Sequence, residues 1–446
     1  MTISRTICLG FLAVITAGTF LLMMPFSTST GQWNDPIVAL FTSTSAVCVT
    51  GLAVVDTGTD FSFWGQFFIL LLAQIGGLGY MTTTTFLILL VGRKFDLRHK
   101  LAIQDAFDRP LLHGSQNIIR SVIAMTLMFE IAGTLLLLGV FTPNYGLRGG
   151  LWMAVFHSIS AWNNAGFSLL SDSFVQYQTS PIINLVIPAL IIFGGIGYQV
   201  IFESYLWIEN IVRRKKRKYL FSLNFKVVTS TTLFLLIAGT IAFYFIEIQN
   251  SATLGGINPS QNIMVAWFQS VTTRTAGFNS IDIGEMTNAG LFITIAFMLI
   301  GASPSGTGGG IKTTTFRIIS HCTYSILRGQ DEVILYGRTV PSSLILKAIA
   351  VVFGSLTTIV IAIIMLSITE AEGQFEFIQI FFEVVSAFAT VGLSMGITAS
   401  LSAWGKLILV GIMYMGRVGV LLLMAAILGD PRPSVIRYPE ENLLIG

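Results

Sequence analysis

Four segments of the sequence share a spacing that could hold a dehydrated cation. Each has an aromatic residue ten positions before a glycine, with at least one Ser or Thr between them. The pairs are Phe41 and Gly51, Phe156 and Gly166, Trp267 and Gly277, and Phe382 and Gly392. Glycine permits backbone angles that other residues avoid, which lets carbonyl oxygens turn toward one point. Rings of such oxygens replace the hydration shell of an alkali ion.

These four glycines recur at nearly constant intervals along the chain. They are separated by 115, 111 and 115 residues, and three of the four segments carry a Ser-Ala pair at the same place. The pairs are Ser45-Ala46, Ser160-Ala161 and Ser386-Ala387. A single segment of this kind is explained well enough as a turn after a short interfacial helix. Fourfold recurrence instead indicates internal repetition around a shared site.

The composition shows what surrounds these segments. The chain has 446 residues, with 25 Lys and Arg, 22 Asp and Glu, 53% apolar residues and only three cysteines. Mean hydropathy is +0.78. Only 11% of the residues are charged, against about 25% in soluble domains. This composition excludes a soluble or disordered chain, and the net charge of +3 gives no footprint for nucleic acid. Cys8, Cys48 and Cys322 form neither a disulfide framework nor a metal cluster.

Eight apolar stretches are long enough to cross a bilayer, so an all-α membrane protein with eight transmembrane helices is predicted. Continuous apolar runs exclude a β-barrel. The first run fits a signal peptide only in part, because it is long and lacks a cleavage motif, so an uncleaved helix is expected. The eight stretches are Thr6–Asn34, Phe61–Gly92, Ile118–Phe141, Ser173–Phe202, Val227–Ile246, Met286–Ile311, Ala348–Thr369 and Trp404–Gly429.

The basic residues predict the orientation of these spans. Lys and Arg concentrate in cytoplasmic segments of membrane proteins. With the N-terminus inside, only Arg148, Arg274, Lys406 and Arg417 of the 25 fall elsewhere. Both termini are therefore expected in the cytoplasm of a protein that crosses the cell membrane several times. Acidic residues gather in the external connections, where they would concentrate cations.

Each external connection carries a further apolar segment that is too short to span. The predicted unit is therefore span, half-helix, pore loop and span, repeated around one central pore. Backbone that is not helical survives at membrane depth only where protein or water surrounds it. The four half-helices would direct their negative C-terminal ends toward the pore, which favours a cation. The predicted units are residues 1–117, 118–225, 226–340 and 341–446, the last of which includes a C-terminal tail.

The sixth span is interrupted by Gly301–Gly310, which holds five glycines and Pro304. Such a sequence cannot stay helical. A nucleotide-binding phosphate loop is rejected, because Ile311 separates Gly310 from Lys312 and no strand precedes the segment. A broken helix can be the substrate site of a transporter with inverted repeats, but the four repeats here are parallel. A gate is the other interpretation.

Several motifs resemble those of the Trk/Ktr/HKT superfamily of potassium transporters, most closely its KtrB-type membrane subunits. They are Trp162–Phe167, Arg274–Asn279, Gly301–Thr314 and Gly416–Gly419. The resemblance covers essentially the whole chain. It implies four non-identical filter strands around a single pore, with potassium bound by backbone carbonyls. Sodium-selective plant relatives carry Ser in place of the first filter glycine. Gly51 therefore favours potassium, while sodium permeation or sodium dependence stays open.

By this resemblance, two sets of residues are expected to act on the ion. The gate is an intramembrane loop that obstructs the pore and moves on activation, formed by Gly301, Ser303, Ser305, Gly306, Thr307, Gly308, Gly309, Gly310 and Lys312. The selectivity filter consists of Val49, Thr50, Gly51, Asn164, Ala165, Gly166, Thr275, Ala276, Gly277, Thr390, Val391 and Gly392.

Two arginines lie outside the predicted cytoplasmic segments and near the pore. An ionisable residue inside a span is a functional candidate by default, and this applies to Arg417. A structural ion pair with Glu383 or Glu130 is the alternative. The family carries an arginine near the lower end of its filter, so the resemblance implies that Arg417 raises the barrier for cations. Arg274 would repel the ion from within the pore, so we expect it to point into the scaffold and pin the third loop.

The resemblance also implies partners. KtrB-like subunits form homodimers on a cytosolic ring of KtrA-like, nucleotide-binding subunits, so any nucleotide would bind the partner. Docking candidates are Arg93–Arg109, Arg213–Lys218 and Arg328–Arg338, while the tail Asp430–Gly446 could pack at a dimer seam. The basic run at Arg213 also suits anionic membrane lipids.

The sequence contains no set of nucleophile, base and orienting group, so no enzyme activity and no covalent cofactor is expected. Potassium uptake is the leading prediction for the function. The alternative is an ion-coupled secondary transporter of another small solute, which would use the broken helix as its binding site.

Overall fold

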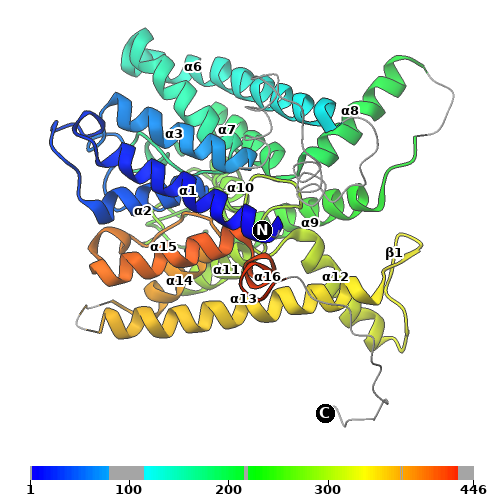
Figure 1. The fold of residues 1–446 in the computed structure, drawn as a ribbon. Helices are drawn as coiled ribbons and strands as arrows, with labels where there is room; N and C mark the ends of the chain where they lie inside the picture. Colours follow the sequence, from blue (N-terminus) through cyan, green and yellow to red (C-terminus); the bar gives the residue numbers. More distant parts are fainter. Residues whose placement is uncertain (1–2, 80–114, 215–218, 372, 374, 430–446) are drawn as a thin grey trace.

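The computed structural model describes residues 3–79, 115–214, 219–371, 373 and 375–429. Within these ranges the chain is built almost entirely from helices, and its N-terminal helix lies beside a late one, α16 (Figure 1). The predicted docking segment Arg93–Arg109 and the tail Asp430–Gly446 lie outside the described residues, as do four residues of the basic run after Arg214.

The first part of the chain forms a long helix, a short one and a third that follows an extended loop. They are α1 (Ile3–Met23), α2 (Pro36–Val47) and α3 (Phe63–Leu78). Asp35 caps α2 by accepting hydrogen bonds from two backbone amides, and Pro36 fits the first helical position. Ser62 caps α3 through the amide of Gly65. These local signals explain why the chain starts helices at these points.

The other elements complete the same alternation of long and short helices. Three 3₁₀ turns cover Pro25–Ser27, Val175–Tyr177 and Thr398–Ser400. The remaining helices are α6 (Ser115–Trp162), α7 (Pro181–Gly195), α8 (Tyr198–Val212), α9 (Leu223–Glu247), α10 (Pro259–Thr272), α11 (Asn288–Leu299), α12 (Thr313–Leu327), α13 (Ser342–Thr369), α14 (Phe377–Phe388), α15 (Ala403–Val418) and α16 (Val420–Leu428).

A small antiparallel hairpin joins α12 to α13. Strands β1 (Ile334–Leu335) and β2 (Arg338–Thr339) pair in it, and Val333 and Leu335 pack in a small cluster with Val227 of α9. The hydroxyl of Tyr336 donates to Ser230 at 2.7 Å. The predicted docking segment Arg328–Arg338 therefore begins at the end of α12 and includes β1 and the first residue of β2.

The apolar helices differ in length from the eight predicted spans. Within the described ranges, α1, α6, α9 and α13 are long and apolar enough to cross a membrane, and two bent pairs bring the number to six. The run from Thr6 to Asn34 is helical only to Met23, and α11 ends at Leu299 before the glycine-rich loop. The chain is thus a helical membrane protein that crosses the bilayer several times.

Two predicted spans are not continuous helices, which corrects the expectation from their apolar runs. α7 and α8 meet at 102°, and α15 and α16 meet at 95°. Gly197 (φ 94°) and Gly419 (φ 89°) lie at the two breaks. Such angles are available to glycine at little cost and end a helix where the chain turns sharply.

A kink divides α6 into a long and a short part. Gly146 adopts φ 68° and ψ 177°, and Pro143 lies just before it. The part after the kink ends at Trp162 and corresponds to the short apolar segment predicted before Gly166. The predicted unit boundaries at 117/118 and 225/226 fall in the first turns of α6 and α9. The start of α9 is set by Ser222, whose hydroxyl accepts a hydrogen bond from Phe225 N at 3.1 Å.

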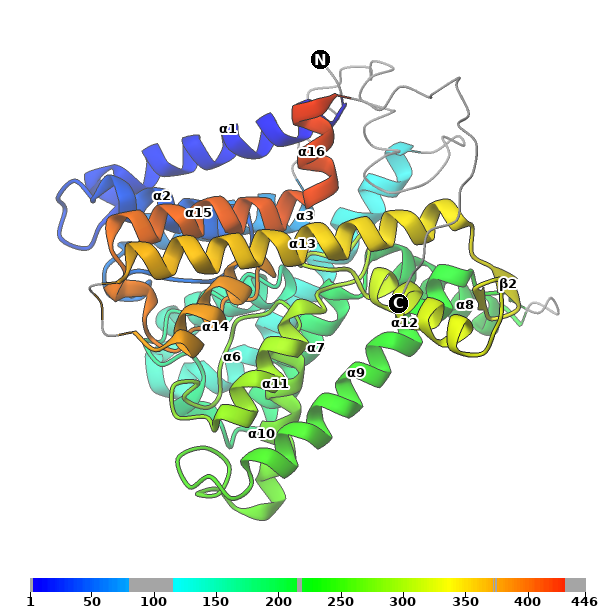
Figure 2. The same ribbon diagram turned by 90° about the horizontal axis from the view of Figure 1, so that it is seen from below.

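Packing between the helices follows a cyclic order. α3 contacts α6, α7 contacts α10, α11 contacts α14, and α15 contacts α2. Each short helix also packs on the long helix before it, as α2 does on α1 and α10 on α9. Seen from below, α13 and α15 run side by side while α7, α9, α10 and α11 gather on the other side (Figure 2). The contacts therefore lead around the molecule and return to its first helices.

Candidate functional site

The four predicted pore segments share an unusual backbone. Each short helix ends a few residues before a glycine with positive φ, at Gly51 (90°), Gly166 (71°), Gly277 (78°) and Gly392 (92°). The residue two positions earlier is also left-handed in every case, at Val49 (52°), Asn164 (55°), Thr275 (66°) and Thr390 (52°). Left-handed backbone is costly for residues with a β-carbon and persists only where the surroundings require it. The same pattern in all four segments marks one kind of site.

The four glycines meet in a ring. A β-carbon on Gly51 would lie 2.6 Å from the carbonyl oxygen of Ala165, and one on Gly166 would lie 2.8 Å from that of Ala276. In the same way, Gly277 faces the carbonyl of Val391, and Gly392 faces that of Thr50. Each of the first three glycines therefore faces the carbonyl of the residue that precedes the next glycine in the chain. The fourth glycine, Gly392, faces the carbonyl that precedes the first, Gly51, and this closes the ring. Side chains have no room here.

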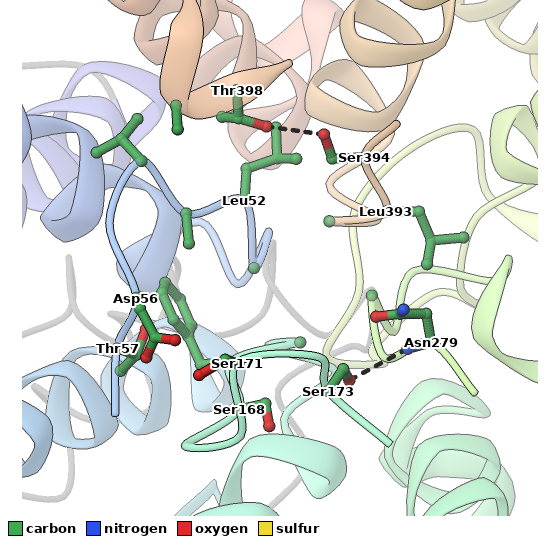
Figure 3. A pocket seen from close by; sticks show the side chains of 18 of the residues that line it. Leu52, Asp56, Thr57, Ser168, Ser171, Ser173, Asn279, Leu393, Ser394 and Thr398 are labelled. Carbon is green, nitrogen blue, oxygen red and sulfur yellow. Dashed lines mark hydrogen bonds between the residues drawn. The ribbon is translucent and has the colours of Figure 1, made fainter. Parts of the chain in front are cut away.

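Above the ring lies an open cavity of about 370 Å³. All four glycines line it, together with Asp56, Asp172 and several hydroxyl groups. Figure 3 shows Asp56 and Thr57 on one side of this cavity, and Ser394 and Thr398 on another. The hydroxyl of Ser173 accepts from the amide of Asn279 at 3.2 Å and joins the walls formed by the second and third segments. Polar atoms and two carboxylates thus surround the approach to the ring.

Buried hydroxyl groups brace the turns from behind. The Ser45 hydroxyl donates to Leu52 O at 2.7 Å and accepts from Gly51 N at 3.1 Å. Ser160 donates to Phe167 O at 2.8 Å, and Ser386 accepts from Gly392 N at 3.1 Å. The recurring Ser-Ala pair was visible in the sequence, but its role as a brace was not predicted.

The third segment is shorter by one residue than the other three. Its bracing hydroxyl belongs to Thr272, which donates to Phe278 O at 2.5 Å. The fully buried aromatic residue is Phe268, whereas Trp267, which the spacing had aligned with Phe41, is only partly buried. The alignment on the glycine was therefore one residue out of register at the start of this segment. Equal spacing to the glycine could not show it.

The glycine-rich segment after α11 forms a buried loop against the residues that precede the glycines, whereas the cavity is lined by the glycines and the residues that follow them. Ile300 and Ile311 pair at its base, and Gly301 N donates to Ile311 O at 2.8 Å. At its tip, Gly309 N donates to the hydroxyl of Thr390 at 3.0 Å. A β-carbon on Gly308 would overlap the hydroxyl of Thr275. The loop therefore lies directly beneath two of the four segments.

The same loop is bound to the break between α7 and α8. Ser303 N donates to Gly195 O at 3.0 Å, and Thr307 N donates to Gly194 O at 3.2 Å. On the other side of the break, Tyr198 N donates to Ser305 O at 3.2 Å. The broken helix thus holds three points of the loop, which no feature of the sequence had indicated.

Two cationic side chains bind consecutive carbonyls of this loop. Arg417 donates to the carbonyl oxygens of Thr307 and of Gly76 in α3, and Lys312 donates to Gly308 O at 2.6 Å. Among the described residues, Arg417 therefore forms no ion pair with Glu383 or Glu130, and that alternative prediction is wrong. Glu383 instead accepts from Ser394 at 2.9 Å and from Thr398, and Glu130 lies 3.4 Å from Asn163 Nδ2. Both acids find neutral donors near their own helices.

Arg274 turns away from the cavity above the ring. Its side chain is 7% exposed and lines a separate cavity of about 10 Å³ between α7, α9 and α10. Its Nε has no hydrogen-bond partner among the described residues. The side chain is thus placed within the scaffold.

The fold and the site together define a helical membrane protein in which four loop segments meet at one place within the apolar body. The family model of TrkH, described as a cation transport protein, matches residues 5–434. The chain belongs to this family of cation transport proteins.

Individual relatives are similar along nearly the whole chain. The Ktr system potassium uptake protein B of Bacillus subtilis (strain 168) is 39% identical over 99% of this chain and 96% of its own length. The protein of the same name from Vibrio alginolyticus is 38% identical, over 99% and 94%. The potassium/sodium uptake protein NtpJ of Enterococcus hirae is 36% identical, over 99% and 97%. The resemblance inferred from the motifs is confirmed.

A solved structure shares the fold. The crystal structure of the potassium transporter TrkH from Vibrio parahaemolyticus superposes with a TM-score of 0.71, covering 95% of this chain and 85% of that chain. The two sequences are 16% identical in this comparison, so the likeness concerns the arrangement of the chain.

Proposed function

We propose that this protein takes up potassium across the cell membrane as the ion-translocating subunit of a Ktr-like system. The ring of Gly51, Gly166, Gly277 and Gly392 is the observation that carries this proposal. Its relatives named as potassium uptake proteins, which match over nearly the whole chain, support the choice of ion. A transporter of another small solute, the alternative considered from the sequence, has no relative among those named above to support it.

Four units around one axis would form the pore, with eight membrane crossings and both termini in the cytoplasm. The cyclic order of contacts from α3 to α6, α7 to α10, α11 to α14 and α15 to α2 supports this arrangement. The third unit would end before α13, and its inner part would carry the gate loop. The short helices that end at the ring would point their negative ends inward.

In this mechanism a potassium ion first enters the outer cavity, which Asp56 and Asp172 make attractive to cations. It then loses its water to backbone carbonyls of the residues that precede and include the four glycines. The selectivity filter would therefore consist of Val49–Gly51, Asn164–Gly166, Thr275–Gly277 and Thr390–Gly392. The side chains that flank the glycines differ among the four segments, so this ring is less regular than one made of four identical strands. Such a ring is compatible with a role for sodium.

The buried loop from Gly301 to Lys312 would be the gate. It closes the path by lying against Thr275 and Thr390 at the inner end of the ring, and it is tied there by Arg417 and Lys312. Ion flow would require these contacts to open. Deleting the glycine run Gly308–Gly310 should raise the resting ion flux.

Regulation would come from outside the chain. A homodimer on a KtrA-like cytosolic ring would receive nucleotide on the partner subunits. The hairpin of β1 and β2, which overlaps the predicted docking segment Arg328–Arg338, is a candidate docking surface. Sodium dependence is a further part of the proposal, supported by the 36% identity with a protein named for potassium and sodium uptake.

The test is cation uptake by the purified protein in liposomes, comparing potassium, rubidium and sodium. Potassium and rubidium should be preferred, and Gly51→Ser should reduce this preference because a side chain has no room at Gly51. Gly31→Ser is the matched control, since Gly31 also has positive φ (68°) but nothing lies within 4 Å of an added β-carbon. Equal uptake of all three ions by the unmodified protein would contradict the proposal.

A further inference from the structure

Arg274 is a buried charge without an acidic partner among the described residues. Its side chain is 7% exposed, its Nε has no hydrogen-bond partner, and the ion pair found in the described part of the chain joins Arg213 to Glu209 instead. A guanidinium keeps its charge in proteins. Placing it in an apolar interior is unfavourable unless something compensates the charge. The surroundings of Arg274 should therefore contain that compensation.

The cavity beside Arg274 shows what these surroundings are. It is lined by Ile191, Ile192 and Gly195 from the last turn of α7, and by Ala302 from the gate loop. Leu236 and Val271 complete the wall. Its volume of about 10 Å³ has room for no more than one water molecule. No lining residue besides Arg274 carries a polar side chain. The negative features of this lining are two helix ends, the last turn of α7 and the last turn of α10, which holds Val271.

A helix C-terminus carries partial negative charge and leaves backbone carbonyls without partners in the helix. At the end of α7 two of these carbonyls are taken by the gate loop, because Gly195 O accepts from Ser303 N and Gly194 O accepts from Thr307 N. The gate loop thus caps α7 in the closed arrangement. Arg274 lies at the same helix end and contributes its charge without a hydrogen bond from Nε.

Movement of the gate loop would change the end of α7 in two ways. Gly194 O and Gly195 O would lose their donors, and the wall formed by Ala302 would leave the cavity of Arg274. Unpaired carbonyls in a membrane interior are strongly unfavourable. A second donor at the same helix end would remove that obstacle to opening.

We propose that Arg274 is this second donor: a positioning residue that caps the C-terminus of α7 when the gate loop leaves, and thereby stabilises the conducting arrangement. The proposal rests on the gate assigned above under the proposed function. It gives Arg274 a role in the open state, whereas pinning the third loop would act in both states alike.

The test compares Arg274→Gln and Arg274→Lys in full-length protein reconstituted in liposomes. Arg274→Gln should lower potassium flux about tenfold, the factor that one hydrogen bond from a charged donor supplies. Arg274→Lys should restore much of the flux, since lysine keeps a charged donor. Arg148→Gln, which removes an exposed positive charge, is the matched control and should leave flux unchanged.

The decisive measurement repeats Arg274→Gln in the variant that lacks Gly308–Gly310. With the gate already released, the substitution should no longer lower flux. An equal loss in both backgrounds, or a gain of flux in the intact protein, would overturn the role of Arg274 while leaving the gate in place. Unchanged flux after the loop deletion alone would overturn the gate, and this proposal with it.

Discussion

The backbone amide of Gly309, in the glycine-rich loop, donates a hydrogen bond of 3.0 Å to the hydroxyl of Thr390, in the fourth loop of the ring. These residues are 81 positions apart in the chain, and both are buried. One bond thus joins the predicted gate to the predicted filter. A displacement of either loop would stretch or break this hydrogen bond.

Thr390→Val should raise the resting flux of potassium about tenfold. The substitution keeps the shape of the side chain but leaves the buried amide of Gly309 without an acceptor, which costs about 1–3 kcal/mol in the closed arrangement. Flux into liposomes without activating partner measures this. Thr390→Ser should behave like the unmodified protein. The control is Thr44→Val, because the Thr44 hydroxyl bonds only to Leu40 O in its own helix, at 2.8 Å. Resting flux that stays at the original level in Thr390→Val would show that the bond does not hold the loop.

Replacing Arg417 or Lys312 by Gln should also raise resting flux. The two side chains donate hydrogen bonds to the adjacent carbonyls of Thr307 and Gly308. Each substitution therefore removes one charged hydrogen-bond donor from the same short stretch of the loop. The double variant should gain less than the product of the two single effects, because residues that act on one element do not act independently. Lys406→Gln serves as the control for loss of a charge on α15. A fall in flux in either single variant would contradict this view.

Thr272→Val should weaken the preference for potassium over sodium by several fold. The Thr272 hydroxyl braces the third loop through Phe278 O at 2.5 Å, and it does so from a position that differs from that of Ser45 or Ser160. Competition between potassium and sodium in the uptake assay measures the effect. Thr294→Val is matched to it, since the buried Thr294 hydroxyl bonds to Gly290 O at 2.8 Å inside α11. The same loss in both variants would point to general loosening of the fold.

Glu247→Ala should lower the stability of the protein without changing its preference among ions. Glu247 is 1% exposed and accepts from Thr287 N at 3.0 Å, Thr287 Oγ1 at 2.6 Å and Thr253 Oγ1 at 2.7 Å, so it ties the end of α9 to the start of α11. Losing these acceptors should cost about 3 kcal/mol. The temperature of unfolding in detergent is the measurement. Glu285→Ala, which removes an exposed acid from the connection that leads to α11, should leave it unchanged, and a shift in ion preference in Glu247→Ala would argue against a purely structural role.

Much of the architecture was predictable because its causes are local. The scarcity of charge and the apolar runs from α1 to α13 follow from the chemistry of a bilayer, which any segment meets by itself. The spacing of Gly51, Gly166, Gly277 and Gly392 identified the residues that lie together in the ring. Five glycines and a proline in one stretch are enough to end a helix, so the loop after Leu299 could be expected.

Other features could not be predicted, because their causes lie in contacts between distant segments. Apolar runs continued across Gly197 and Gly419, so the bends of 102° and 95° went unnoticed. The one-residue difference at Thr272 became visible only from which hydroxyl reaches the loop. Arg417 bonds to the carbonyls of Thr307 and Gly76 and not to an acidic side chain. The positions of acidic residues in the sequence do not show which backbone carbonyls a long side chain can reach.

The amino-acid sequence by itself determined that this chain is a helical membrane protein of the Trk/Ktr kind, and which glycines form its ring. Hydropathy carries the first part of that information within single segments. The recurrence of the glycine at intervals of 115, 111 and 115 residues, together with the family motifs, carries the rest. Only the tertiary structure decided how the loop beneath the ring is held, by Thr390, Lys312, Arg417 and the carbonyls at the end of α7. Those hydrogen bonds mostly join residues far apart in the chain, and the choice among many possible buried donors and acceptors is made by packing.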